Sequence, residues 1–334
     1  MRFTKLFAAV LCSLAALAAS GQNLRDEIAA NPGKSGGVYY VYTYDNPVLT
    51  PAPKGYKPFY ISHYGRHGSR WLLHDSEYDE VMAVFRAADA ANAFTERGRE
   101  VYGRVKRVYD DGIDRGGDLS PLGAEQHREI AARMYRNFPE VFRSGAVVDA
   151  QATLVVRCVL SMAAFCERLK ELNPRLEVSR TAGRRTTRYL NFYSKPTNPT
   201  LSREYLDFID KGGWQEEYER IGDRFVRPGR LMSELFADGE FVRTIDAQKL
   251  MKGLFYFAAD MQNVGLGISF YDLFTTDELY GLNVYDNYKY YVIRGPSPLN
   301  RRFPQYYAKA LLEDFLTRAD RAVEGGAVSA DLRF

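Results

Sequence analysis

The chain alternates short apolar runs with helical patterns, and this alternation limits the folds open to it. The runs at 59–63, 152–156, 176–179 and 329–334 predict buried strands, and the segments between them carry apolar residues at helical spacing. Strands that alternate with helices favour an α/β fold with a mainly parallel sheet flanked by helices. Ligands bind such sheets at the carboxyl ends of the strands. We therefore expect the functional residues directly after these runs.

A histidine between two arginines follows the first run, in the segment Arg66-His67-Gly68-Ser69-Arg70. Permanent cations on both sides disfavour the imidazolium form, so His67 is expected to stay neutral and nucleophilic. Guanidinium groups grip phosphate oxygens two at a time. A nucleophile beside an anion clamp is what phosphoryl transfer to a histidine requires. The alternative is a solvated basic loop with an incidental histidine.

Further arginines follow the second and third runs. Arg157 stands at the predicted start of a helix, where a cation is mildly unfavourable against the helix dipole, and this favours a ligand role over an ordinary surface position. Arg184, Arg185 and Arg188 follow the third run. They are equally consistent with contacts to additional phosphate groups and with a solvated basic loop.

Charge and histidine content exclude several classes of function. The formal net charge of the 334 residues is +3, which gives no support for nucleic-acid binding, because that usually needs a strongly basic face. The four histidines show no zinc-ligand spacing, and no glycine loop of the nucleotide-binding type is present. The sequence therefore predicts neither a metal nor another cofactor.

The first 21 residues have the pattern of a secretory signal peptide. Arg2 and Lys5 give a basic start, residues 6–18 are apolar, and small residues at 18–21 offer a cleavage site. The apolar stretch is too short for a comfortable membrane span, and no later segment is long enough. We expect an exported protein, periplasmic or extracellular after cleavage.

The rest of the chain divides by composition into a core and an insertion. Residues 181–252 carry prolines at 196, 199 and 228 and several amphipathic helical patches. We interpret 181–252 as an inserted helical cap domain, and 22–180 together with 253–334 as the α/β core.

Three segments resemble a known family. Residues 66–70 resemble the signature of the second branch of the histidine phosphatases, which includes acid phosphatases and phytases. Residues 119–126, Leu-Ser-Pro-Leu-Gly-Ala-Glu-Gln, are similar to the family's Leu-Thr-x-x-Gly-x-x-Gln helix start. Arg157 matches a third phosphate-binding arginine that the family places on a strand-to-helix turn. The pattern is most like that of the multiple inositol polyphosphate phosphatases.

This resemblance implies an activity and a set of roles. His67 would attack phosphorus and form a phosphohistidine, while Arg66, Arg70 and Arg157 would hold the equatorial oxygens. The substrate would be a phosphomonoester, an inositol polyphosphate such as phytate, with no metal required. Two alternatives stay open: a broad-specificity histidine acid phosphatase, and a phosphate- or phytate-binding protein without turnover.

One family feature is missing from this sequence. In the family, a general acid from a His-Ala-Glu or His-Asp motif near the C-terminus protonates the leaving alkoxide. Here no histidine follows His127, and the strand-like run 329–334 ends the chain. We therefore expect these 334 residues to be a fragment that stops before the motif. General acid catalysis typically contributes about 10²–10⁴-fold to the rate.

Overall fold

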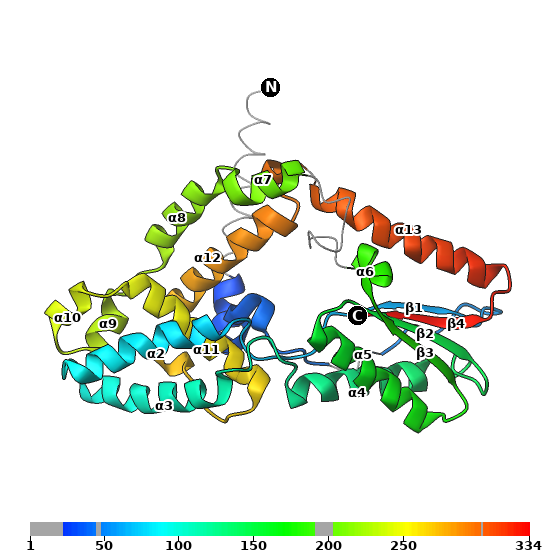
Figure 1. The fold of residues 1–334 in the computed structure, drawn as a ribbon, viewed down its shortest axis with the longest axis horizontal. Helices are drawn as coiled ribbons and strands as arrows, with labels where there is room; N and C mark the ends of the chain where they lie inside the picture. Colours follow the sequence, from blue (N-terminus) through cyan, green and yellow to red (C-terminus); the bar gives the residue numbers. More distant parts are fainter. Residues whose placement is uncertain (1–22, 45–47, 191–202, 302) are drawn as a thin grey trace, which may run out of the picture.

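The computed structural model describes residues 23–44, 48–190, 203–301 and 303–334 (Figure 1). The predicted signal peptide, 1–21, lies outside the described residues, as does the segment 191–202 of the predicted cap. Within the described ranges, no helix is both long enough and apolar enough to cross a membrane.

A four-stranded sheet lies at one end of the molecule, and neighbouring strands in it run parallel (Figure 1). Its strands are β1 (Ile61–Tyr64), β2 (Val147–Ala152), β3 (Glu177–Ala182) and β4 (Val328–Arg333). Their order across the sheet is β1-β4-β2-β3, so β4 pairs with β1 on one side and with β2 on the other. The predicted α/β class with a mainly parallel sheet is confirmed.

Helices cover both faces of this sheet. One face carries α4 (Pro121–Asn137) and α5 (Val156–Leu172), and the other carries α6 (Arg184–Leu190) and α13 (Phe303–Val323) (Figure 1). Side chains of α4, α5, β2 and β4 form a hydrophobic core between the helices and the sheet, with Val148, Phe165 and Leu332 fully buried.

The second strand lies earlier in the chain than the sequence analysis predicted. The expected strand was 152–156, but β2 occupies Val147–Ala152, residues 153–155 form the turn, and Val156 begins α5. The polar residues of β2 interrupt the apolar run by which a buried strand is predicted. Asp149 faces α13, where it accepts a hydrogen bond from Arg318 at 2.8 Å, and Arg318 also donates to Asp331 of β4 at 2.6 Å. Partly buried ion pairs on one face thus replace the apolar residues expected there.

The other end of the molecule is helical (Figure 1). Its helices are α2 (Asp75–Ala90), α3 (Glu96–Gly112), α7 (Arg203–Lys211), α8 (Trp214–Phe225), α9 (Gly229–Leu235), α10 (Gly239–Arg243), α11 (Ala247–Val264) and α12 (Thr276–Arg294). Short 3₁₀ helices are η1 (Pro32–Tyr39), η2 (Tyr271–Leu273) and η3 (Pro298–Asn300).

A second hydrophobic core holds these helices together. It joins α2 and α3 to α9, α11 and α12, with Phe85, Val105, Leu235 and Phe257 among its buried members. The packing therefore groups segments from both sides of residue 181. The predicted boundaries of a cap at 181–252 stay a prediction.

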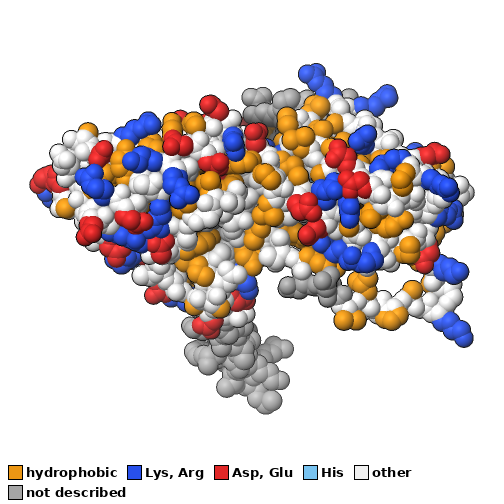
Figure 2. All heavy atoms as spheres, turned by 90° about the horizontal axis from the view of Figure 1, so that it is seen from below, with side chains coloured by type: hydrophobic (Ala, Val, Ile, Leu, Met, Phe, Trp, Pro, Cys, Tyr) orange, Lys and Arg blue, Asp and Glu red, His pale blue; other side chains and the backbone are white. Residues whose placement is uncertain are grey.

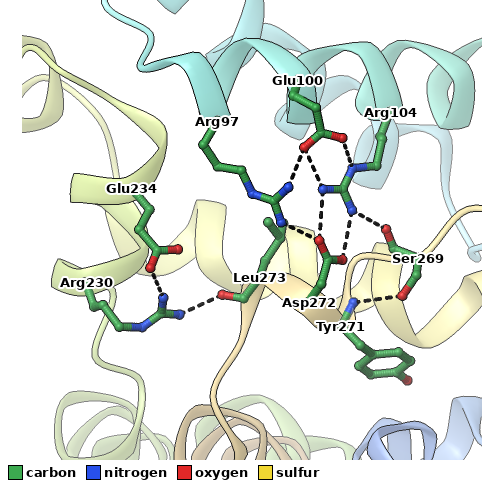
Figure 3. A network of polar contacts seen from close by, with 9 residues as sticks. All are labelled: Arg97, Glu100, Arg104, Arg230, Glu234, Ser269, Tyr271, Asp272 and Leu273. Carbon is green, nitrogen blue, oxygen red and sulfur yellow. Dashed lines mark hydrogen bonds and ion pairs between the residues drawn. The ribbon is translucent and has the colours of Figure 1, made fainter.

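Charged side chains secure the outer surface of this helical part. Arg104 of α3 donates to Asp272 of η2 at 2.8 Å and to the Ser269 carbonyl oxygen at 2.6 Å, and Arg97 pairs with the same aspartate (Figure 3). Exposed pairs of this kind contribute little to stability singly, but a network contributes more.

Figure 2 shows basic and acidic side chains intermixed, with hydrophobic ones between them, over the face seen from below. No single sign of charge dominates that face.

Candidate active site

The segment after β1 crosses from the sheet to α2 and carries the arginines and histidine that the sequence singled out. It pairs with the second motif segment, because Arg70 and Leu119 form an antiparallel bridge and the Ser120 amide donates to the Ser69 carbonyl oxygen at 2.9 Å. Ser120 then caps α4 by accepting from the Gly123 amide at 3.2 Å. The two motifs therefore hold one another in place.

Two glycines let these segments approach closely. A Cβ atom on Gly68 would lie 2.2 Å from the Gly123 carbonyl oxygen, and one on Gly123 would lie 2.2 Å from the Ser69 carbonyl oxygen. Both contacts are far shorter than real Cβ contacts, and both are to backbone atoms. Each motif therefore needs its glycine for packing against the other.

Buried polar side chains fix the conformation of this loop. Gln126 of α4 accepts from the Ser69 amide at 2.8 Å and donates to the Ser69 hydroxyl at 3.0 Å. The Ser69 hydroxyl in turn donates to Asn263 Oδ1 of α11 at 2.7 Å, and the Gly68 amide donates to the Ser161 hydroxyl of α5 at 3.1 Å. The loop is thus anchored to helices from both ends of the molecule.

His67 is held as a neutral imidazole. Its Nδ1 atom lies 2.8 Å from the Gly68 carbonyl oxygen, which can only accept, so Nδ1 carries the hydrogen and Nε2 carries the lone pair. Burial lowers the pKa of His67 to about 4, and the charges of Arg66, Arg157 and Arg70 act in the same direction. At neutral pH the Nε2 atom is therefore an available nucleophile.

The charges of three arginines act on this histidine. Arg66 and Arg70 come from the same loop as His67, and Arg157 comes from α5. The Arg66 guanidinium donates to the Val38 carbonyl oxygen at 2.9 Å. Arg70 is buried, donates to the Trp71 carbonyl oxygen at 2.6 Å and lies 4.9 Å from the centre of the Tyr39 ring. Burial, followed by the charge of Arg70, lowers the pKa of Arg66. The site therefore holds closely spaced positive charges.

Arg157 joins the site from the first turn of α5. Its Nη1 atom lies 3.4 Å from the Gly117 carbonyl oxygen, in a turn that docks on the segment after β1 through the Gly117 amide and the Leu72 carbonyl oxygen at 2.6 Å. Gly117 has a φ of +79°, a conformation that favours glycine. The charge of Arg157 acts on His67, so the four residues predicted for the site lie near one another, although Arg157 is not among the described residues that line the cavity. Their roles stay a prediction.

A cavity of about 600 Å³ opens beside His67. The residues that line it come from η1 and the segment after it, the loop after β1, α4 and α11, and include Tyr39, His67, Arg70, Gln126, Asp260 and Asn263. Among the described residues, no group of three or more His, Cys, Asp or Glu side chains is placed to hold a metal ion.

Sequence reasoning gave no role to several residues of this site. Gln126 was noted only as part of a motif, and Asp260, Asn263 and Tyr39 were not singled out. A signal for two of them exists: Asp260 and Asn263 are polar positions in α11, whose other buried residues are apolar. Polar residues on an otherwise buried helix face indicate a specific partner or a site.

The other described histidines and arginines of interest take different positions. His63 and His127 also line the cavity beside His67. His63 stacks on Phe165 with ring centres 5.4 Å apart, and His127 packs against Phe334 at 5.4 Å. Arg184 and Arg185 are exposed on α6 and are not among the described residues that line the cavity. The side chain of Arg188 lies outside the described residues.

No protein-family model and no curated protein matches the sequence. Solved structures do match the fold. The multiple inositol polyphosphate phosphatase of Bifidobacterium longum in complex with inositol hexasulfate superposes with a TM-score of 0.72 at 18% identity, over 89% of this chain and 78% of that one. Its complex with phosphate gives a TM-score of 0.71 at 19% identity, over 88% and 75% of the two chains.

The phytase from D. castellii gives a TM-score of 0.61 at 13% identity, over 90% of this chain and 64% of that one. The chain therefore has the fold of these phosphatases. The resemblance that three motif segments indicated is confirmed at the level of the fold.

Proposed function

We propose that this chain, which shares the fold of an inositol polyphosphate phosphatase and a phytase, is a histidine-dependent phosphomonoesterase acting on inositol polyphosphates such as phytate. The observation that carries the proposal is the neutral imidazole of His67 with the charges of Arg66, Arg70 and Arg157 around it. A neutral nucleophile next to three fixed cations suits attack on a phosphate monoester.

The reaction proceeds in two steps. In the first, the Nε2 lone pair of His67 forms a bond to phosphorus while the ester P–O bond breaks, and the departing alkoxide takes up a proton from water. In the second, water attacks phosphorus, the N–P bond breaks, and inorganic phosphate leaves. The guanidinium groups hold the three equatorial oxygens, whose negative charge spreads in the transition state. The Gly68 carbonyl oxygen keeps the Nδ1 hydrogen in place, so that Nε2 faces the reaction.

Two observations support an inositol polyphosphate over a smaller ester. The cavity of about 600 Å³ is larger than a single phosphate group requires. The similar phosphatase of Bifidobacterium longum has been crystallised with inositol hexasulfate and with phosphate. A broad-specificity acid phosphatase and a binding protein without turnover are the alternatives that the experiment must separate.

The test compares phosphate release by the wild-type chain and its His67→Ala variant. Phytate and nitrophenyl phosphate serve as substrates, and His74→Asn is the matched control, because His74 is an exposed histidine at the start of α2. Asparagine is also a favoured residue at a helix N-cap. We expect wild type and control to release phosphate faster from nitrophenyl phosphate than from phytate, because the sequence lacks the family's general-acid motif, and we expect no release by His67→Ala. Rapidly quenched wild type should contain an acid-labile phosphohistidine.

The other possible results of the phosphate-release assay distinguish the alternatives. Equal release from many unrelated esters would favour the broad-specificity enzyme. Release from the nitrophenyl ester alone would show the nucleophile and clamp acting without a proton donor for an alkoxide. Binding of phytate without any release would favour the binding protein. Full activity of His67→Ala would contradict the proposed mechanism.

We also propose that the protein is exported, on the basis of the basic, apolar and small-residue pattern of residues 1–21. Fractionation of cells that express the full chain, with N-terminal sequencing of the product, tests this. Recovery of uncleaved protein in the cytoplasm would contradict it.

A further inference from the structure

A buried carboxyl group lines the same cavity as Arg66 and Arg70 and has no role in the mechanism above. Asp260 of α11 is 0% exposed, yet it belongs to the wall of the cavity beside His67. Among the described residues, neither of its carboxyl oxygens makes a hydrogen bond of regular geometry. The nearby Leu72 amide acts to lower the pKa of Asp260, but it donates its hydrogen bond to the Tyr78 hydroxyl at 3.0 Å. Buried polar atoms without partners are uncommon in folded proteins and call for an explanation.

The groups that face Asp260 come from three elements. Arg70 belongs to the loop after β1, Tyr39 to η1, and Glu77 and Tyr78 to α2. Arg70 is the cation among them, and its Nε atom also lacks a hydrogen-bond partner within the described part of the chain. An acid and a guanidinium, both buried and both with unused hydrogen-bonding atoms, thus share one wall of the site.

Burial raises the pKa of Asp260 to about 8, Arg70 opposes this shift, and the Glu77 carboxylate adds to it. The carboxyl group is therefore mostly protonated at pH 7. In that state the Arg70 charge is not compensated by Asp260 and is fully available to a bound anion. An ionised Asp260 would attract the same guanidinium and would repel the anion.

We propose that Asp260 is a positioning residue for Arg70, whose carboxyl charge competes with a bound phosphate ester for that guanidinium. The inference rests on the proposed function of residues 66–70 as a phosphate clamp. Anion binding and proton binding at Asp260 favour one another, and this coupling is reciprocal. Anion affinity therefore falls as Asp260 ionises, and anion binding at alkaline pH takes up a proton at this carboxyl group.

Inositol hexasulfate is the probe for this coupling. Sulfate esters stay ionised across the range tested, whereas phosphate monoesters titrate near pH 6 and would obscure the effect. Binding is measured by calorimetry from pH 6 to pH 9 with the wild-type chain, Asp260→Asn and Asp286→Asn. Asp286 is a second buried acid, on α12, that accepts a hydrogen bond from Tyr256 at 3.0 Å, and asparagine can accept the same bond.

For wild type and the Asp286→Asn control, we expect inositol hexasulfate affinity to fall at least about fivefold between pH 6 and pH 9, the lower end of typical coupling between sites. For Asp260→Asn we expect a nearly constant affinity, equal to that of wild type at pH 6 and tighter at pH 9. The variant keeps the shape of the side chain and removes its charge. Parallel pH profiles of wild type and Asp260→Asn would overturn the proposal.

A second measurement needs no variant. Binding enthalpies at pH 8 in two buffers of different ionisation enthalpy count the protons taken up, and we expect a substantial fraction of one proton per wild-type molecule. No uptake would overturn the coupling while leaving the clamp intact. Absence of inositol hexasulfate binding at every pH would instead overturn the clamp, and with it the proposed function, so the two failures are distinguishable.

Discussion

Replacing Gly68 by alanine should abolish most of the activity, because the added methyl group clashes with the neighbouring segment. The new Cβ atom would lie 2.2 Å from the Gly123 carbonyl oxygen, whereas real Cβ contacts essentially never fall below 3.0 Å. The two segments must therefore separate by about 1 Å, a shift that packing alone resists at a cost of about 1–3 kcal/mol. Neither side offers a flexible side chain that could move instead.

The same shift moves the nucleophile. Gly68 follows His67 directly and accepts its Nδ1 hydrogen bond, so displacement of Gly68 reorients the imidazole. A misplacement of about 1 Å costs on the order of 10²-fold in rate. We therefore expect kcat/KM of Gly68→Ala to be about 10²-fold lower than that of wild type. Each kcal/mol of lost stability lowers the melting temperature by about 2–4 °C, so the variant should melt several degrees lower.

The assay is nitrophenyl phosphate hydrolysis together with a thermal melt, and Gly103→Ala is the control. Gly103 lies within α3, and a Cβ atom there would have no neighbour within 4 Å. Alanine in a helix interior is favoured over glycine by about 0.5–1 kcal/mol, so the control should keep its activity and melt slightly higher. Activity of Gly68→Ala within threefold of wild type would refute the close-approach argument.

Further predictions concern the buried polar groups of the site. Gln126→Leu should lower the free energy of unfolding by about 1–3 kcal/mol in denaturant titrations, because the buried Ser69 amide loses its acceptor; an unchanged value would contradict this. Burial lowers the pKa values of His63, His67 and His127 to about 4, from 6.5 in the unfolded chain. The unfolded chain therefore binds more protons in this range, and the melting temperature should fall as the pH drops from about 6.5 to about 4; a flat profile would argue against burial of these rings. The acid limb of kcat/KM should lie near pH 4, where the His67 nucleophile becomes protonated, and a limb near pH 6.5 would contradict its lowered pKa.

Short-range patterns account for what could be predicted from the sequence. Ligands bind parallel sheets at the carboxyl ends of the strands, so a basic segment directly after an apolar run is expected at that edge. Residues 66–70 follow β1 and Arg157 follows β2, in agreement with this expectation. The predicted bounds of the second strand were wrong because β2 contains the polar residues Asp149 and Gln151. Asp149 reads as a loop residue until Arg318, 169 positions later, is seen to pair with it.

The sequence by itself determined the fold class and the basic segments that meet at one edge of the sheet, because strand and helix periods and the order of elements are local properties. Only the tertiary structure decided what surrounds them. Gln126 bonds Ser69 across 57 positions and Asn263 bonds it across 194. Asp260 joins Arg70 in the wall of one cavity only when α11 packs against the loop after β1. Hydrogen-bond partners and the burial of charges depend on which helices pack together, and no local pattern carries that information.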